Sequence, residues 1–69
     1  MNEDVCVRFG EKLRKIRLDL GYSQEELSFK TGLHRTYISS VERGKRNISL
    51  ANTKKLADAL DLKMKDLVP

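Results

Sequence analysis

The sequence predicts an all-α domain of five helices, and three observations support this class. Apolar residues recur at intervals of three and four in several segments, the spacing that places them on one face of a helix. Glycines follow three of these segments, where helices commonly stop. No alternation of β-branched and polar residues indicates a strand. A chain of 69 residues has room for one domain, residues 1–69.

The first helix is expected to span Val5 to Leu20, with Gly21 as its left-handed stop. Its apolar stripe consists of Val5, Cys6, Phe9, Leu13, Ile16 and Leu20. Such a stripe has the width that a helix needs to pack against a core. Leu18 falls on the opposite side of the helix, so we expect no core partner for it.

The second helix begins at a recognisable cap. Ser23 and Glu26 have the spacing of a capping box, in which each side chain binds a backbone N–H of the other residue. Leu27 is expected in the core, and Phe29 at the edge of the helix contact. Gly32 ends this helix and allows a sharp turn.

The third helix is expected from about His34 to Arg43, so residues 24–43 form a helix-turn-helix. Ile38 and Val41 share one face, with Tyr37 beside them, and this face can dock into a core. The opposite face carries Arg35, Thr36, Ser39, Ser40 and Arg43. The third helix therefore predicts one side for packing and one side for binding.

The remainder of the chain predicts two more helical segments. Gly44 ends the third helix, and a basic polar loop follows it. Ser49 is the expected cap of the fourth helix. The residues of that helix expected to face inward are Leu50, Thr53, Leu56, Ala57 and Leu60. A last short helical segment near Lys63 to Val68 presents Met64, Leu67 and Val68, and Pro69 closes it.

Composition excludes several classes of function. No apolar run approaches the roughly 18 residues of a membrane span, and the first ten residues lack a signal-peptide core, so we expect a cytoplasmic protein. Cys6 has no disulfide partner and no second sulfur for zinc, so we interpret it as a small apolar residue of the first helix. His34, the single histidine, is interpreted as a capping or exposed residue. We therefore expect no enzyme, no metal and no cofactor.

A net charge of +4 and its distribution indicate a polyanionic partner, which we interpret as double-stranded DNA. On the third helix the candidates for reading base edges are Arg35, Thr36, Ser39 and Ser40. An arginine there can grip guanine with two hydrogen bonds, or it can contact only phosphate or solvent. The candidates for phosphate contact are Gln24, Tyr37, Arg43, Lys45, Arg46 and Asn47. The alternatives are core-edge packing for Tyr37 and a solvated basic loop.

The pattern Gln24, Ser28, Gly32, Ile38 with Val41, and Glu42-Arg43-Gly44 resembles the helix-turn-helix family of the phage lambdoid repressors and Cro. Within that family, the segment HRTYISSVERGKRN is similar to the controller proteins of restriction–modification systems. The resemblance implies a five-helix repressor-like fold. It also implies a homodimer on a palindromic operator that regulates its own gene and the endonuclease gene. A structural ion pair between Arg17 and Glu42 is implied as well.

Dimerisation is expected through the C-terminal third, residues 48–68. Its surplus apolar residues are Ile48, Leu60, Leu62, Met64, Leu67 and Val68. Two copies could read half-sites about 34 Å apart on one side of the duplex. Glu25 either complements the helix dipole or contacts RNA polymerase bound alongside. The alternative functions are a solitary phage-type repressor and an antitoxin or protein-interaction module.

Overall fold

The computed structural model describes residues 2–69, with side chains placed from Val5 onward. Its helices are α1 (Asn2–Asp19), α2 (Gln24–Thr31), α3 (Arg35–Glu42) and α4 (Leu50–Ala59). A short 3-10 helix, η1 (Met64–Asp66), follows α4. The all-α class is confirmed for these residues, whereas the prediction of five helices was wrong, because the chain has four α-helices.

The segment predicted as a fifth helix forms only the single turn of η1. Its backbone bonds join residues three apart: Asp66 N–H to the Lys63 carbonyl at 2.9 Å, and Leu67 N–H to the Met64 carbonyl at 3.0 Å. An α-helix needs several residues to recover the cost of its first turn. Pro69 follows too closely for that and cannot donate a backbone hydrogen bond.

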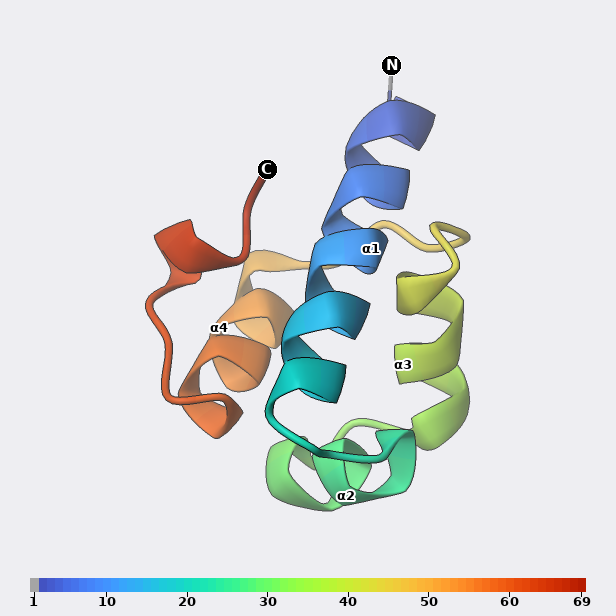
Figure 1. Cartoon of the computed structure of the whole chain (residues 1–69). Coiled ribbons are helices and arrows are strands. Elements are labelled where there is room, and N and C mark those ends of the chain that lie inside the picture. Colours follow the sequence, from blue (N-terminus) through green and yellow to red (C-terminus); the bar gives the residue numbers. More distant parts are fainter. Residues whose placement is uncertain (1) are drawn as a thin grey trace.

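The helices are arranged around α1 and α2 (Figure 1). α1 packs against α3, while α2 contacts both α3 and α4. η1 packs on α4, and Lys12 of α1 donates a hydrogen bond to the Val68 carbonyl at 3.2 Å. The C-terminus and the beginning of α1 lie at one end of the molecule, and α2 closes the other end.

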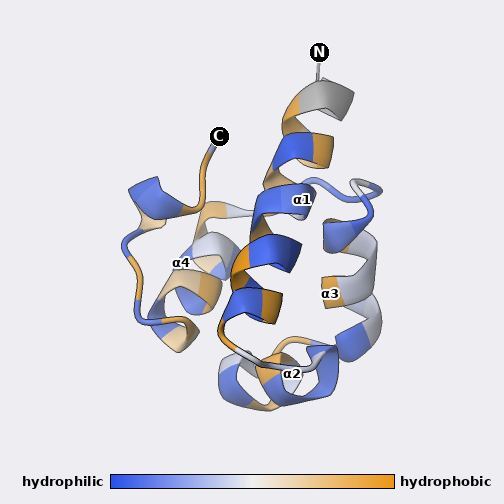
Figure 2. Cartoon of the chain, in the orientation of Figure 1, coloured by the Kyte–Doolittle hydropathy of each residue, from blue (hydrophilic) through white to orange (hydrophobic). Residues whose placement is uncertain are grey.

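Side chains from every α-helix meet in one apolar core, which Figure 2 shows as orange segments turned toward one another. The buried apolar residues are Phe9, Leu13, Leu27, Ile38, Val41, Leu56, Ala57, Leu60 and Leu67. Most of them occupy the predicted periodic positions. Burial of each large side chain contributes about 1.5–3 kcal/mol, so this cluster supplies most of the force that holds the helices together.

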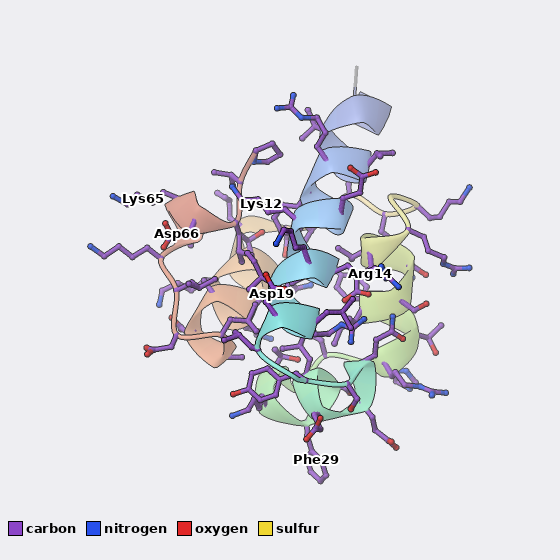
Figure 3. The ribbon with its side chains drawn as sticks, in the orientation of Figure 1. Lys12, Arg14, Asp19, Phe29, Lys65 and Asp66 are labelled. Carbon is purple, nitrogen blue, oxygen red and sulfur yellow. The ribbon has the colours of Figure 1, made fainter. Side chains whose placement is uncertain are left out.

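Four apolar residues predicted to pack are exposed instead. Val5 and Leu20, near the two ends of α1, are 54% and 51% exposed. Leu50, the first residue of α4, is 78% exposed. Phe29 is 91% exposed and points away from α2 into solvent (Figure 3). It lies two residues after buried Leu27, which places it on nearly the opposite side of the helix.

Gly10 permits a close approach of α1 to α3. A Cβ atom at Gly10 would lie 2.6 Å from the carbonyl oxygen of Glu42 and closer still to that of Val41. Both obstacles are backbone atoms, which cannot rotate away as a side chain can. The lack of a side chain at Gly10 therefore sets the distance at which α1 supports α3.

Candidate nucleic-acid interface

The beginning of α2 has the predicted capping box. Glu26 N–H donates to Ser23 Oγ at 2.9 Å, and Ser23 N–H donates to Glu26 Oε1 at 2.8 Å. Gly32 ends α2 with a φ of 75°, in the left-handed region that glycine adopts without strain. Both ends of α2 are therefore defined by local sequence, as predicted.

The turn between α2 and α3 is held by two hydroxyl groups of α2. Ser28 Oγ donates to the Leu33 carbonyl. Thr31 Oγ1 donates to the Leu27 carbonyl at 2.8 Å and accepts from Leu33 N–H at 3.1 Å. Because the backbone of the turn is bonded back to α2, α3 has a fixed direction relative to α2.

α3 has an apolar face and a polar face. Ile38 and Val41 are 0% and 1% exposed, and they anchor the helix on the core. Arg35 and Thr36 are exposed, and Ser39 and Ser40 are half-buried. Within residues 2–69, the hydroxyl groups of Thr36, Ser39 and Ser40 form no side-chain hydrogen bond. The polar groups of this face are therefore free to bind another molecule.

His34 precedes this face as the N-cap of α3, with extended backbone and no side-chain capping bond. It is exposed. Its position agrees with the interpretation as a surface or capping residue, although the backbone rather than the imidazole makes the cap.

Tyr37 is half-buried and joins α3 to two later segments. Asn52 Nδ2 of α4 donates to its hydroxyl oxygen at 3.1 Å. The guanidinium carbon of Arg46 lies 5.2 Å from the centroid of its ring, a cation–π distance. Since the Tyr37 oxygen accepts from Asn52, its own hydrogen remains available to an outside acceptor. The sequence analysis missed Asn52, because nothing in the sequence signals this contact across 15 residues.

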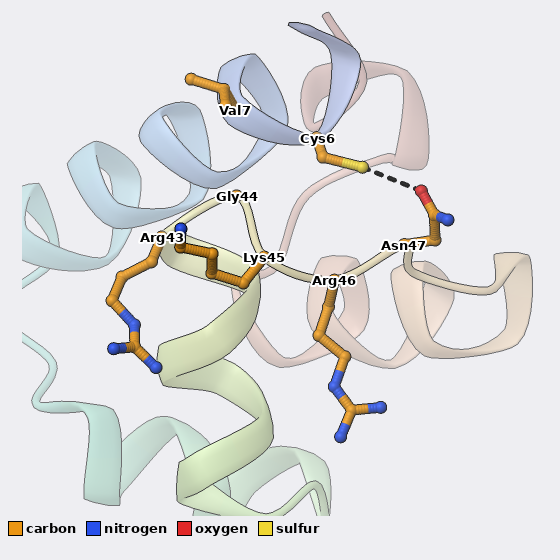
Figure 4. A pocket seen from close by; sticks show the side chains of 7 residues that line it. All are labelled: Cys6, Val7, Arg43, Gly44, Lys45, Arg46 and Asn47. Carbon is orange, nitrogen blue, oxygen red and sulfur yellow. Dashed lines mark hydrogen bonds between the residues drawn. The ribbon is translucent and has the colours of Figure 1, made fainter. Parts of the chain in front are cut away.

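The basic loop after α3 begins with a turn at Gly44, whose φ is 73°. In the view of Figure 4, the side chains of Arg43 and Arg46 extend to the same side of the chain. Lys45 and Arg46 are exposed. Cys6 Sγ of α1 donates to Asn47 Oδ1 at 2.9 Å, which leaves the Asn47 amide nitrogen for other contacts. This bond ties the end of the loop to α1.

Arg17 and Glu42 form an ion pair between α1 and α3, and each is only 6% exposed. Arg17 Nε lies 2.6 Å from Glu42 Oε2, and Nη2 lies 3.0 Å from Oε1. Arg17 Nη1 also donates to the Tyr22 carbonyl at 2.8 Å. The hydrogen bonds from Glu42 raise the pKa of the Arg17 guanidinium above its usual value, although burial opposes this.

Gln24 belongs to the same cluster. Its Nε2 donates to Glu42 Oε1 at 3.0 Å, and its side chain is half-buried at the start of α2. The residue predicted to contact phosphate therefore also contacts the buried ion pair. The sequence analysis did not foresee this contact, because Gln24 and Glu42 are 18 positions apart.

The residues predicted for the dimer interface divide into two groups. Leu60 and Leu67 are 4% and 0% exposed within one chain, because they pack into its own core. Their assignment to a partner-facing surface is therefore corrected. Ile48, Leu62 and Met64 are half-buried, and Val68 is 44% exposed.

Within residues 2–69, none of the helices combines the length and hydropathy that crossing a bilayer requires. In the same part of the chain, no group of three or more histidine, cysteine, aspartate or glutamate side chains is placed to hold a metal ion.

Comparison with known proteins identifies the family. The helix-turn-helix profile matches residues 13–67. The control protein C.BamHI of Bacillus amyloliquefaciens is 49% identical over 69 residues, covering 99% of this chain and 85% of that protein. The crystal structure of the restriction–modification controller protein C.AhdI of Aeromonas hydrophila superposes with a TM-score of 0.88. It is 52% identical and covers 90% of this chain and 94% of its own. The chain belongs to the restriction–modification control proteins.

This controller also resembles a relative whose structure contains DNA. The C.Esp1396I tetramer, in complex with its natural 35-base-pair operator, matches with a TM-score of 0.81 and 34% identity. The match covers 86% of this chain and 78% of that one. The controller is thus a helix-turn-helix transcription regulator, and its α2–α3 unit corresponds to the element that names the family.

Proposed function

We propose that this chain is a dimeric, sequence-specific DNA-binding controller that acts in the cytoplasm. In this proposal it regulates its own gene and the endonuclease gene of a restriction–modification system, without an enzymatic step. One observation carries the proposal: α3 is anchored by buried Ile38 and Val41, while its opposite face is polar, accessible and next to a basic loop. The relationship to C.BamHI and C.AhdI supports it.

Base reading is assigned to the polar face of α3. Arg35 lies in the first turn, the part of a recognition helix that reaches base edges in the major groove. Its guanidinium can donate two hydrogen bonds to guanine O6 and N7, which discriminates by about 1–3 kcal/mol. Thr36, Ser39 and Ser40 supply hydroxyl groups for the neighbouring bases, and the Thr36 methyl can contact a thymine methyl.

Phosphate contacts are assigned to the borders of this face. Arg43, Lys45 and Arg46 supply positive charge at the end of α3. The Tyr37 hydroxyl can donate its remaining hydrogen to a phosphate oxygen. The remaining amide hydrogens of Gln24 and Asn47 can serve as further donors, and they complete the set of phosphate contacts.

The dimer is assigned to residues 48–68, and the helix-turn-helix unit to residues 24–43. Ile48, Leu62, Met64 and Val68 are partly exposed apolar residues that a second copy could cover. Two α3 helices related by a two-fold axis would read half-sites about 34 Å apart, so the operator should be palindromic.

Footprinting of the DNA upstream of the controller's own gene, at two salt concentrations, tests this proposal. We expect two protected half-sites with the same sequence in opposite directions, and weaker protection at the higher salt concentration. Uniform binding along the fragment, or no binding, would reject a sequence-specific controller.

RNA polymerase is proposed as a further partner, contacted by Glu25. Glu26 makes the capping bond, so the exposed carboxylate of Glu25 is not needed for the helix end. It borders a shallow hollow together with exposed Phe29 and His34. We expect Glu25→Ala to reduce activated transcription while operator binding is retained. Unchanged transcription would remove this partner.

A further inference from the structure

The Gln24 amide has one defined orientation. A carboxylate accepts hydrogen bonds but does not donate them when ionised. The Gln24 atom that faces Glu42 Oε1 at 3.0 Å must therefore be the amide nitrogen. One of its two hydrogens is directed at Glu42, and the second remains available.

The contact joins three helices at one corner of the molecule. Gln24 is the first residue of α2, Glu42 is the last residue of α3, and Arg17 lies in the last turn of α1. The Glu42 carboxylate binds both partners, at 2.6 and 3.0 Å from Arg17 and at 3.0 Å from Gln24. Arg17 also binds the Tyr22 carbonyl, in the segment that leads into α2.

Stability alone does not explain this arrangement. A buried ion pair is weak support for stability, since the cost of removing two charges from water offsets their attraction. The ion pair could also form without Gln24, because Arg17 contacts both carboxylate oxygens. The additional bond acts on the N-terminus of α2, which borders the polar face of α3.

We infer that Glu42 is a positioning residue for DNA binding, which orients the Gln24 amide and holds the start of α2 against the end of α3. Gln24 and the reading face of α3 then meet the same stretch of duplex without rearrangement. This inference rests on the proposed DNA-binding function. It differs from an independent role of Gln24, in which the amide would contact phosphate with or without Glu42.

A double-mutant cycle tests the inference. Gln24→Met keeps the length of the side chain and removes the donor. It is compared in two backgrounds: the natural chain and a chain with both Arg17→Met and Glu42→Leu. Replacing both charges together avoids an unpaired buried ion, and such replacements are often tolerated. The probe is the duplex protected in the footprint, and the unfolding free energy is measured for every variant.

We expect Gln24→Met to weaken operator binding about tenfold in the natural chain, the effect of one hydrogen bond to a charged group. In the doubly substituted background, the loss should fall below about twofold. The control is Glu25→Gln, which changes the next residue of the same turn and does not touch Glu42. Its effect should be equal in the two backgrounds.

An equal loss from Gln24→Met in both backgrounds, or no loss in either, would overturn the positioning role. If the natural chain fails to bind the upstream duplex at all, the proposed function fails, and this is seen before any variant is compared.

A second measurement needs no substitution. Hydrogen exchange of the Gln24 side-chain amide should reveal one protected Nε2 hydrogen in the free protein. Two rapidly exchanging hydrogens would contradict the orientation by Glu42.

Discussion

Replacing Gly10 with alanine should destabilise the domain, although alanine favours a helix by about 1 kcal/mol over glycine. The added Cβ would lie 2.6 Å from the Glu42 carbonyl oxygen and closer to that of Val41. Neither oxygen can move without shifting α3 away from α1. The steric effect therefore opposes the gain in helix propensity.

The two effects can be compared in size. Forcing one extra carbon atom into a close-packed contact costs typically 1–3 kcal/mol, and more when backbone must shift. After subtraction of the helix gain, we expect a net loss of about 1–2 kcal/mol. For a domain of 60–100 residues, each kcal/mol lowers the melting temperature by about 4–8 °C. The variant should therefore melt roughly 10 °C below the natural chain.

Thermal unfolding followed by circular dichroism measures this difference. Arg14→Ala is the matched control, because Arg14 is an exposed residue of the same helix (Figure 3). Its melting temperature should stay close to that of the natural chain. A Gly10→Ala variant that melts above the natural chain would refute the close approach of α1 and α3, because helix propensity alone would then decide.

The remaining predictions concern the reading face, the basic loop and the ion pair. Arg35→Ala should relax the preference at one base pair of each half-site, as measured by binding to operator variants; equal losses for operator and random DNA would contradict base reading. Arg46→Ala should reduce the log–log salt slope of binding by about 0.9 per phosphate contact, whereas an unchanged slope would leave Arg46 without a phosphate. Glu42→Gln should cost about 3–5 kcal/mol of unfolding free energy, because Arg17 stays buried without its partner. Arg17→Met combined with Glu42→Leu should recover most of that loss in urea unfolding, and strictly additive effects would discard the coupling.

The helix ends were predictable because they depend on local chemistry. Ser23 and Ser49 cap α2 and α4 through their own hydroxyl groups. Gly32 adopts the left-handed conformation that ends α2. Each signal acts within a few residues of the chain, so sequence spacing alone is enough to identify it.

The extent of burial was less predictable. Periodicity sorts residues onto faces of a helix, but it does not reveal how far the neighbouring helices cover each face. Leu50 and Phe29 are therefore exposed where packing was expected, and Leu60 and Leu67 fill the core of their own chain. The role of Gly10 also depends on a distant backbone, that of α3.

The candidate site shows the same division. The accessible face of α3 follows from its spacing and was predictable. The bonds from Gln24 to Glu42, from Asn52 to Tyr37 and from Cys6 to Asn47 join distant parts of the chain. Only the fold brings these partners together, so no local pattern in the sequence could indicate them.

The most direct test is a nuclear magnetic resonance titration of the chain with its footprinted duplex. The account predicts that the largest changes occur at Arg35, Thr36 and Ser39 on the open face of α3, and in the loop that follows Arg43. Changes confined to α4 or η1, with the α3 signals unmoved, would contradict the claim that this face binds DNA.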